Sequence, residues 1–268
     1  MPNITMSLPR LAFVHVPKTA GSSLTAALAN AYGASTLPAM TTLDYPCYTG
    51  EQLASFRFYK GHAYRRDYAR LPADTRRFTV LRDPVERAVS YFNYYRTLDV
   101  SDITDPFALE ACELARTASP VEFIYADSPF VIEHLRCGQL RQFLPEDLLA
   151  TIGHRQFLSR RMRGDVVAAA LEELRGFTAV LTCDMLFLGW PLFVRQLGLP
   201  QSCARLPHLN VAPPGEPPDL ADVRRALIDV NAAEFCCYHA IRQREQRWLA
   251  ESFAAHPYTR FSLCGKAA

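Results

Sequence analysis

The chain has 268 residues, which is enough for one α/β domain with a sizeable core or for two small domains. Hydrophobic residues make up 49% of it and charged residues 21%, a balance that excludes a disordered chain, a coiled coil and a collagen-like fibre. The formal net charge of +2 is too small to indicate a polyanionic partner by itself. No apolar run reaches the roughly 18 residues of a transmembrane helix, and the N-terminal segment lacks the features of a signal peptide. We therefore expect a cytoplasmic protein without a membrane span.

Apolar, β-rich runs alternate with helix-forming segments in the first part of the chain. Strands are expected at 11–16, 56–60 and 77–81, and helices at 24–32 and 85–98. Pro84 would occupy the first turn of the second helix, and Asp83 before it would be the cap.

The remainder of the chain is mostly helical in pattern. Helices are expected at 106–117, 119–126, 128–143, 164–175 and 220–252, a further helix capped by Asp184 should run to about residue 197, and a strand is expected at 177–182. A proline-rich stretch at 200–219 is expected to be an extended loop. This alternation predicts a three-layer α/β/α fold with a central parallel sheet and many added helices, in a single domain spanning 1–268.

The loop after the first strand has the composition of an anion-binding site. Its sequence is KTAGSS, from Lys18 to Ser23, and a helix follows at once. Backbone N–H groups at such a helix start point toward a ligand, and the helix dipole favours negative charge there. Gly21 allows close approach of the backbone, Lys18 adds a cation, and hydroxyls come from Thr19, Ser22 and Ser23. We expect phosphate chemistry here, the alternative being an ordinary strand-to-helix turn.

The order of residues in this loop argues against a nucleotide triphosphatase. That class uses GxxxxGK[ST], in which glycine precedes lysine, whereas here Lys18 precedes Gly21. No strand ends in an obvious magnesium-binding aspartate, and no cysteine pair or histidine cluster has the spacing of zinc ligands. We therefore expect no metal.

The third expected strand ends in a second candidate phosphate clamp. Arg82 follows the strand, and Ser90 comes eight residues later, on the helix. A guanidinium beside a hydroxyl matches the oxygens of a phosphate group. The alternative makes Arg82 part of an internal ion pair and Ser90 an ordinary helix residue.

Together, the two segments are more specific than either alone. FVHVPKTAGSSL and FTVLRDPVERAVSYFNYYR lie about 65 residues apart and resemble the sulfotransferases that use 3′-phosphoadenosine 5′-phosphosulfate (PAPS), in particular the Golgi-type carbohydrate family with the heparan sulfate 2-O-sulfotransferases and bacterial relatives. The resemblance implies a P-loop-type α/β fold and sulfonate transfer to a hydroxyl, with a saccharide as the expected acceptor. It places the 5′-phosphosulfate in a loop of Lys18, Thr19, Ala20, Gly21, Ser22 and Ser23. It assigns the 3′-phosphate to Arg82 and Ser90.

The same resemblance suggests the catalytic groups. Histidine suits a general base because its pKa lies near neutrality, and in the 2-O-sulfotransferases a histidine in a strand–Gly–His context serves as base, which corresponds to His62. Lys18 would neutralise the departing phosphate oxygen. Glu86 and Glu133 are the alternative bases, and His15, inside the first expected strand, is interpreted as structural.

The acceptor is not identified by the sequence. Two arginine clusters could steer an anionic polysaccharide or could simply be solvated: Arg65, Arg66, Arg70, Arg76 and Arg77, and Arg155, Arg160, Arg161 and Arg163. Two other functions stay open beside the sulfotransferase: a P-loop kinase of a small molecule, and a non-catalytic nucleotide- or polyanion-binding protein. A nucleic-acid partner is not expected, because the charge is nearly balanced and no recognition motif is present.

Overall fold

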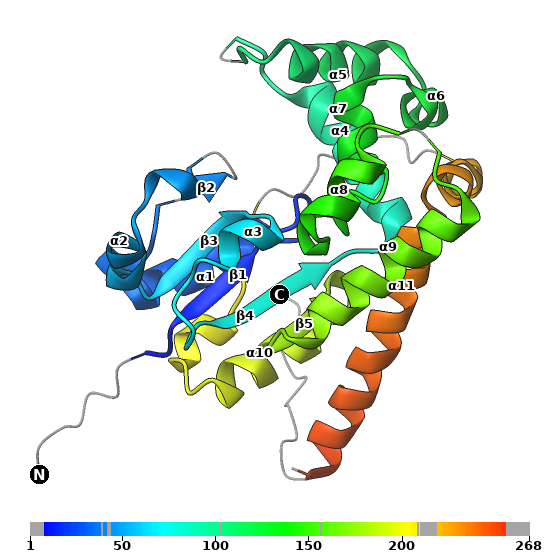
Figure 1. The fold of residues 1–268 in the computed structure, drawn as a ribbon. Helices are drawn as coiled ribbons and strands as arrows, with labels where there is room; N and C mark the ends of the chain where they lie inside the picture. The colour runs from blue at the N-terminus through cyan, green and yellow to red at the C-terminus, as the bar shows by residue number, and fades with distance from the viewer. Residues whose placement is uncertain are drawn as a thin grey trace, which may run out of the picture.

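Five parallel strands form one sheet in the order β2-β3-β1-β4-β5 (Figure 1). The computed structural model describes residues 8–38, 40–41, 44–101, 103–155, 157–207, 209 and 219–255. The strands are β1 Leu11–Val14, β2 Met40–Thr41, β3 Phe58–His62, β4 Arg76–Leu81 and β5 Ala179–Thr182. Helices cover both faces of the sheet, so the expected three-layer α/β/α class is confirmed.

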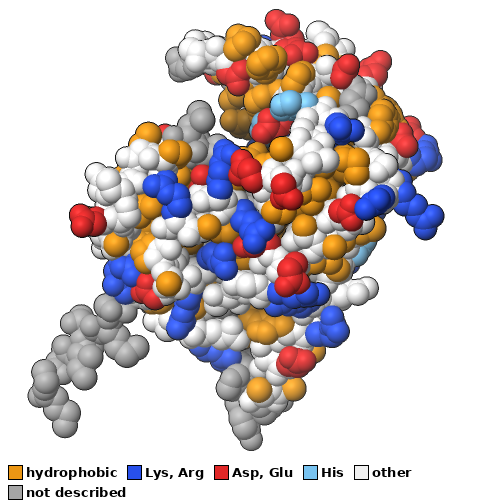
Figure 2. All heavy atoms as spheres, in the orientation of Figure 1, with side chains coloured by type: hydrophobic (Ala, Val, Ile, Leu, Met, Phe, Trp, Pro, Cys, Tyr) orange, Lys and Arg blue, Asp and Glu red, His pale blue; other side chains and the backbone are white. Residues whose placement is uncertain are grey.

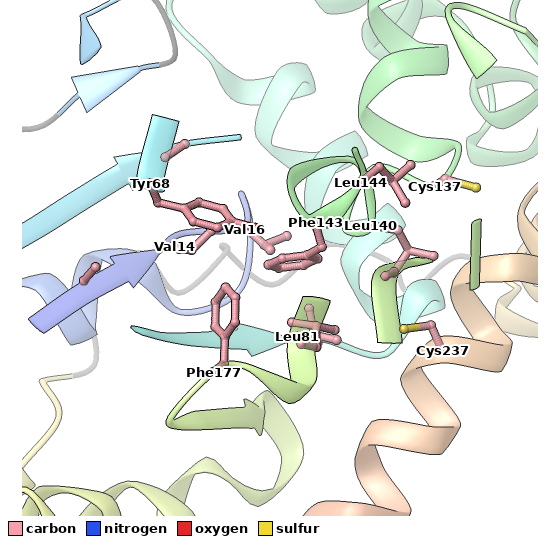
Figure 3. Close-up of a cluster of buried hydrophobic side chains, with 14 of the residues drawn as sticks. Val14, Val16, Tyr68, Leu81, Cys137, Leu140, Phe143, Leu144, Phe177 and Cys237 are labelled. Atoms are coloured by element: carbon pink, nitrogen blue, oxygen red, sulfur yellow. The ribbon is translucent and has the colours of Figure 1, made fainter. Parts of the chain in front are cut away.

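Alternating side chains of the central strand feed two separate cores. Leu11 and Phe13 of β1 pack with α1 (Gly21–Tyr32) and α10 (Leu186–Gln196). Ala12 and Val14 point to the other face, where the covering helices are α8 (Glu146–Ile152), α9 (Arg160–Arg175) and α11 (Leu220–Ala255). Figure 3 shows part of this second core, with Phe143 directed toward Val16. A strand buried on both faces is typical of a parallel sheet between helical layers.

Further helices form a lobe beyond one end of the sheet (Figure 1). They are α4 (Pro84–Thr97), α5 (Pro106–Thr117), α6 (Pro120–Tyr125) and α7 (Pro129–Leu135), and they share a third core with the first part of α11. Each of these four helices begins with a proline, whose fixed φ near −65° suits the first turn of a helix. Asp83 caps α4 as expected, accepting hydrogen bonds from the backbone N–H groups of Val85 (2.9 Å) and Glu86 (3.2 Å).

Three expected elements in the earlier part of the chain end away from their predicted positions, and the first is the strand expected at 11–16, which stops at Val14. The strand expected at 56–60 continues through Gly61 to His62, because Gly61 pairs with both β1 and β2. The helix expected at 128–143 stops at Leu135, since Cys137 has a φ of 55° and a Cβ at Gly138 would lie 1.9 Å from the carbonyl oxygen of His134. The chain resumes there only as a short 3-10 turn at Arg141–Phe143.

The two C-terminal helices also differ from expectation. Asp184 does not cap α10: its carboxylate accepts a hydrogen bond from the Tyr238 hydroxyl (2.7 Å) and pairs with Arg242. The helix expected at 220–252 is kinked at Asn231, whose side chain accepts a hydrogen bond from the N–H of Cys137. The same amide donates to the carbonyl of Leu135, so the kink is tied to the end of α7.

Several short elements were not expected. They are β2, α2 (Gly50–Ser55), α3 (Arg65–Tyr68), α8 and the 3-10 turns Gly33–Ser35, Tyr45–Cys47, Cys183–Met185 and Gln201–Ala204. Half of the proline-rich loop expected at 200–219 lies outside the described residues, and in the described half Gln201–Ala204 forms a 3-10 turn where an extended loop was expected. Within the described ranges, no helix is both long enough and apolar enough to cross a membrane.

A buried carboxyl group between β5 and α11 makes stability depend on pH. Glu245 is 2% exposed and accepts a hydrogen bond from the Thr182 hydroxyl (2.5 Å). Burial raises its pKa from 4.5 to about 7. Between these two values the folded protein keeps a proton that the unfolded chain has lost, so the free energy of unfolding should fall as pH rises through this window, by about 1.4 kcal/mol per pH unit at most.

Replacing this group should remove that decline. Glu245→Gln keeps a hydrogen-bond acceptor for Thr182, and its stability advantage over the wild-type protein should grow from pH 5 to pH 7.5. Urea unfolding of both proteins at the two pH values measures the difference. An advantage independent of pH would contradict the raised pKa.

Candidate functional site

The loop between β1 and α1 leads into a helix whose first backbone N–H groups have no side-chain cap. Lys18 and Ala20 have φ angles of 69° and 63°, a left-handed conformation that few non-glycine residues adopt. Left-handed residues within a turn direct successive N–H groups into one concave face, which binds anions. Ala20 stands at the N-cap of α1 and has no side-chain acceptor to offer. The first N–H groups of this 12-residue helix are therefore suited to an anionic ligand.

Gly21 is required where it stands because an imidazole lies against it. A Cβ at this position would be 1.8 Å from Nε2 of His15. The ring of His15 also stacks on Phe13, with centroids 5.1 Å apart, and so has little room to move. The close packing of loop and strand thus depends on the missing side chain.

Gly21→Ala should therefore destabilise the protein by about 1–3 kcal/mol through overpacking. Gly164→Ala is the matched control, because nothing lies within 4 Å of a Cβ at that helical position. The control should stabilise by about 0.5–1 kcal/mol. Chemical unfolding of both variants measures these changes, and an unperturbed Gly21→Ala protein would show that His15 does not block the position.

Lys18 extends from this loop into the cavity. Its Nζ lies 4.0 Å from the centroid of the Tyr94 ring, a cation–π contact. Partial burial lowers its pKa, and nearby Arg82 lowers it further. Thr19 differs from its neighbours: its hydroxyl is fully buried and donates to the carbonyl of Val16 (2.7 Å). Thr19 as a whole is 0% exposed and does not line the cavity, so its hydroxyl serves the loop itself.

Arg82 is held at its backbone and leaves its guanidinium at the cavity. The side-chain amide of Gln139 accepts from the N–H of Arg82 (2.8 Å) and donates to its carbonyl (2.9 Å). The guanidinium donates to the carbonyl of Lys18 (3.4 Å) and pairs with Glu86 (3.3 Å). This ion pair is solvent-exposed and hence weak, so an incoming phosphate could displace it. Ser90 lines the same cavity from α4.

A buried network supports this arrangement. Gln139 also donates to Glu234 (2.6 Å), and Glu234 pairs with Arg87 (3.3 Å). The side chains of Arg87 and Glu234 are 2% and 1% exposed. Removing one member would leave a buried charge without its partner, which is costly. Sequence reasoning missed the role of Gln139, since it lies 57 residues from Arg82 and carries no local signal.

His62 ends β3 with its imidazole oriented by the backbone. Its Nδ1 lies 2.9 Å from the carbonyl oxygen of His15. A carbonyl only accepts, so Nδ1 carries the proton, and Nε2 is left with the lone pair that a base needs. Gln142 donates to the same carbonyl (3.0 Å). Burial lowers the pKa of His62, which keeps the imidazole neutral.

His15 lies just beyond β1 rather than inside it and takes part in the site. Its ring is 4.5 Å from that of His62, centroid to centroid. Burial, with the charges of His62, Lys18 and Lys60, lowers its pKa to about 3. The neutral ring of His15 packs against Gly21, and its backbone carbonyl orients His62, so His15 has a structural role at the edge of the cavity.

A cavity of about 1100 Å³ joins these groups at the carboxyl ends of β1, β3 and β4. Ligands of open α/β sheets bind at this edge. The lining contains these expected residues: Lys18, Ala20, Gly21, Ser22, Ser23, His62, Arg82 and Ser90. Both alternative bases, Glu86 and Glu133, line it as well. Among the described residues no group of three or more His, Cys, Asp or Glu is arranged to hold a metal ion.

The carboxyl ends of β1, β3 and β4 lie in a part of the chain that matches a known protein family. Residues 5–107 match the Sulfotransferase family model. This segment, which is similar to sulfotransferases, holds the Lys18 loop, His62, Arg82 and Ser90. The match supports sulfonate transfer to a hydroxyl-bearing acceptor as its general activity. The comparison with curated proteins finds no match.

Proposed function

We propose that the protein transfers a sulfonate group from PAPS to an acceptor hydroxyl, with a saccharide as the expected acceptor. One observation carries the proposal. A single cavity is lined by the Lys18 loop with the uncapped start of α1, by the guanidinium of Arg82 and by the imidazole of His62. The loop offers N–H groups for a 5′-phosphosulfate, and Arg82 with Ser90 offers a separate cationic clamp for a 3′-phosphate. An anion with two charged ends fits this pair of subsites.

His62 would accept the proton of the attacking hydroxyl at Nε2. Its Nδ1–H is engaged with the carbonyl of His15, and burial keeps the ring neutral, so the lone pair is ready at neutral pH. Lys18 would stabilise the negative charge that develops on the departing phosphate oxygen. PAPS supplies the activated sulfonate, and no metal enters this scheme.

We propose further that residues 1–268 act as one domain, although the family match ends at 107. Two features support this: β5 pairs with β4, and Gln139 from the later part of the chain holds the backbone of Arg82. The remaining part of the chain would thus complete the donor site.

Arg82→Ala should weaken the binding of adenosine 3′,5′-bisphosphate by about 1.5–3 kcal/mol, the value of a charged hydrogen bond. The affinity for AMP, which lacks the 3′-phosphate, should change little. Arg65→Ala is the matched control, since Arg65 pairs with Glu173 (2.8 Å) and lies outside the cavity lining. Calorimetric titration gives the affinities; an equal loss for both nucleotides would remove Arg82 from the 3′-phosphate clamp.

The activity itself is tested with radiolabelled PAPS and a mixture of hydroxyl acceptors. Acceptor-dependent release of adenosine 3′,5′-bisphosphate with label in the acceptor is the expected result. Magnesium-dependent phosphate transfer from ATP would instead establish a kinase. Binding of the bisphosphate with no transfer to any acceptor would favour a non-catalytic protein.

A further inference from the structure

The part of the cavity around His62 includes residues from α7 and from the segment after β3. Glu133 and His134 of α7 line it with Tyr64, which follows His62 by two residues. His62 and His134 line the same cavity, and burial lowers the pKa of His134. Tyr64, Glu133 and His134 are called the acceptor side of the cavity from here on.

Aromatic rings stand next to the acceptor side. The ring of His134 stacks on Phe130 (4.1 Å between centroids) and meets Tyr91 edge-on (5.5 Å). Tyr94, on the same helix as Tyr91, is 41% exposed and contacts Lys18. Tyr91 is 3% exposed, so Tyr94 is the tyrosine of this helix whose ring is open to an acceptor in the cavity.

The charged group of the acceptor side is a carboxylate. Glu133 accepts one hydrogen bond, from the Tyr64 hydroxyl (3.0 Å). Among the ion pairs between described residues, none involves Glu133. A carboxylate with open lone pairs accepts hydrogen bonds from hydroxyl or ammonium groups and repels anions.

The first arginine cluster, which could have steered an anionic chain, lies outside the cavity lining. Arg66 does lie over the ring of Tyr64, 5.9 Å from its centroid, but it pairs with Glu146. Arg65 and Arg77 both pair with Glu173 (2.8 and 3.1 Å). Arg70 donates to the carbonyls of Tyr45 and Tyr48 (2.6 and 2.7 Å). None of these arginines belongs to the cavity lining.

The second cluster does not reach the cavity either. Arg160, Arg161 and Arg163 occupy the first turn of α9, and Arg155 precedes it; all four are absent from the cavity lining. On the molecular face in Figure 2, basic and acidic side chains are interspersed and form no large basic patch. Field steering of a polyanion toward His62 thus has no support from these arginines.

Arg141 is a positively charged residue of the same cavity lining whose charge would oppose that of Glu133. It lines the cavity but is 6% exposed. Its Nη2 donates to the carbonyl of Gly153 (2.7 Å) and its Nε to that of Arg136 (3.3 Å). These bonds tie the guanidinium to the backbone and leave Glu133 as the more accessible charge.

We infer that the acceptor is a saccharide without carboxylate or sulfate groups near the reacting hydroxyl, and that it donates a hydrogen bond from a hydroxyl or ammonium group to Glu133. This inference rests on the proposed sulfonate transfer. It separates the protein from enzymes that act on polyanionic chains, because the residues beside His62 select against negative charge.

Three hexasaccharides that differ in charge test the inference: a β1,4-glucose hexamer, a β1,4-glucosamine hexamer and a hyaluronan hexamer. Transfer from labelled PAPS should give a kcat/KM at least about tenfold higher for the neutral and amino hexamers than for hyaluronan. Glu133→Gln should reduce this preference, because the neutral amide does not repel an anionic acceptor as the carboxylate does. Glu146→Gln is the matched control: Glu146 is exposed, pairs with Arg66 and lies outside the cavity lining, so rate and preference should persist.

Binding of adenosine 3′,5′-bisphosphate, measured on the same preparations, separates the two levels of the proposal. Failure to bind it would overturn the sulfotransferase function itself. With binding intact, a preference for hyaluronan, equal rates for all three, or transfer to none of them would overturn the acceptor class alone. An unchanged preference in Glu133→Gln would also overturn the role of Glu133.

Discussion

Replacing Lys18 by alanine is expected to lower kcat by about 10²- to 10³-fold, the usual effect of removing a group that stabilises a developing negative charge. The ammonium enters the cavity from a left-handed loop residue and rests on the ring of Tyr94. A cation–π contact of this kind is weak, so the ammonium can leave the Tyr94 ring and bind the phosphate oxygen on which negative charge develops. Steady-state kinetics with PAPS and a saturating acceptor measure the loss.

Lys60→Ala is the matched control for this prediction. Lys60 lies on β3, two residues before His62, and is absent from the cavity lining. Lys60 is half-buried and its charge contributes to the lowered pKa of His15, but it does not line the cavity, so the variant should retain a kcat within about threefold of the wild-type value. A Lys18→Ala enzyme as fast as the control would show that another group stabilises the leaving oxygen.

The second large effect is expected at His62. His62→Gln keeps an N–H donor for the carbonyl of His15 but removes the basic nitrogen, so transfer should fall about 10²- to 10⁴-fold. The affinity for adenosine 3′,5′-bisphosphate should stay unchanged, because His62 is assigned to the acceptor hydroxyl. His154→Gln, at an exposed histidine outside the cavity lining, is the control.

The pH profile distinguishes a base from a packing residue at this position. Burial lowers the pKa of His62 below its ordinary value of 6.5. Protonation removes the base, so kcat should hold constant as pH falls to 6.5 and should decline only at lower pH. His62→Gln should lack this acidic limb. A limb that survives in the variant would point to Glu133 or Glu86 as the base.

Local sequence signals were enough to predict the elements around the Lys18 loop. An apolar run, then KTAGSS, then a helix former predicts strand, anion loop and helix start, and the structure has β1, the Lys18 loop and α1 there. Asp83 followed by Pro84 likewise predicts the beginning of α4. Each of these signals spans a few adjacent residues, which is why they can be read without a structure.

Features that depend on distant contacts could not be predicted. Gln139 holds Arg82 across 57 residues, and Asn231 kinks α11 by binding the carbonyl of Leu135 across 96 residues. Neither amide differs in the sequence from an ordinary polar residue. The early end of α7 also depends on space: only a residue without a side chain fits at Gly138, against the carbonyl of His134.

The engagement of the arginines is the same kind of information. Counted along the chain, Arg65, Arg70 and Arg77 suggest a basic surface. In the fold, Arg65 and Arg77 pair with Glu173, and Arg70 donates hydrogen bonds to two backbone carbonyls. Arginines that are close in the sequence therefore do not place their charge in the cavity lining, which is one ground for the acceptor class that we infer.

Calorimetric titration with adenosine 3′,5′-bisphosphate, compared with ATP plus magnesium, tests the donor site most directly. Both ligands carry an adenosine and several negative charges, but only the first has the 3′-phosphate assigned to Arg82 and Ser90. Tight binding of the bisphosphate with little response to ATP is the predicted result. Binding of ATP alone, or of neither ligand, would contradict a PAPS site at the Lys18 loop.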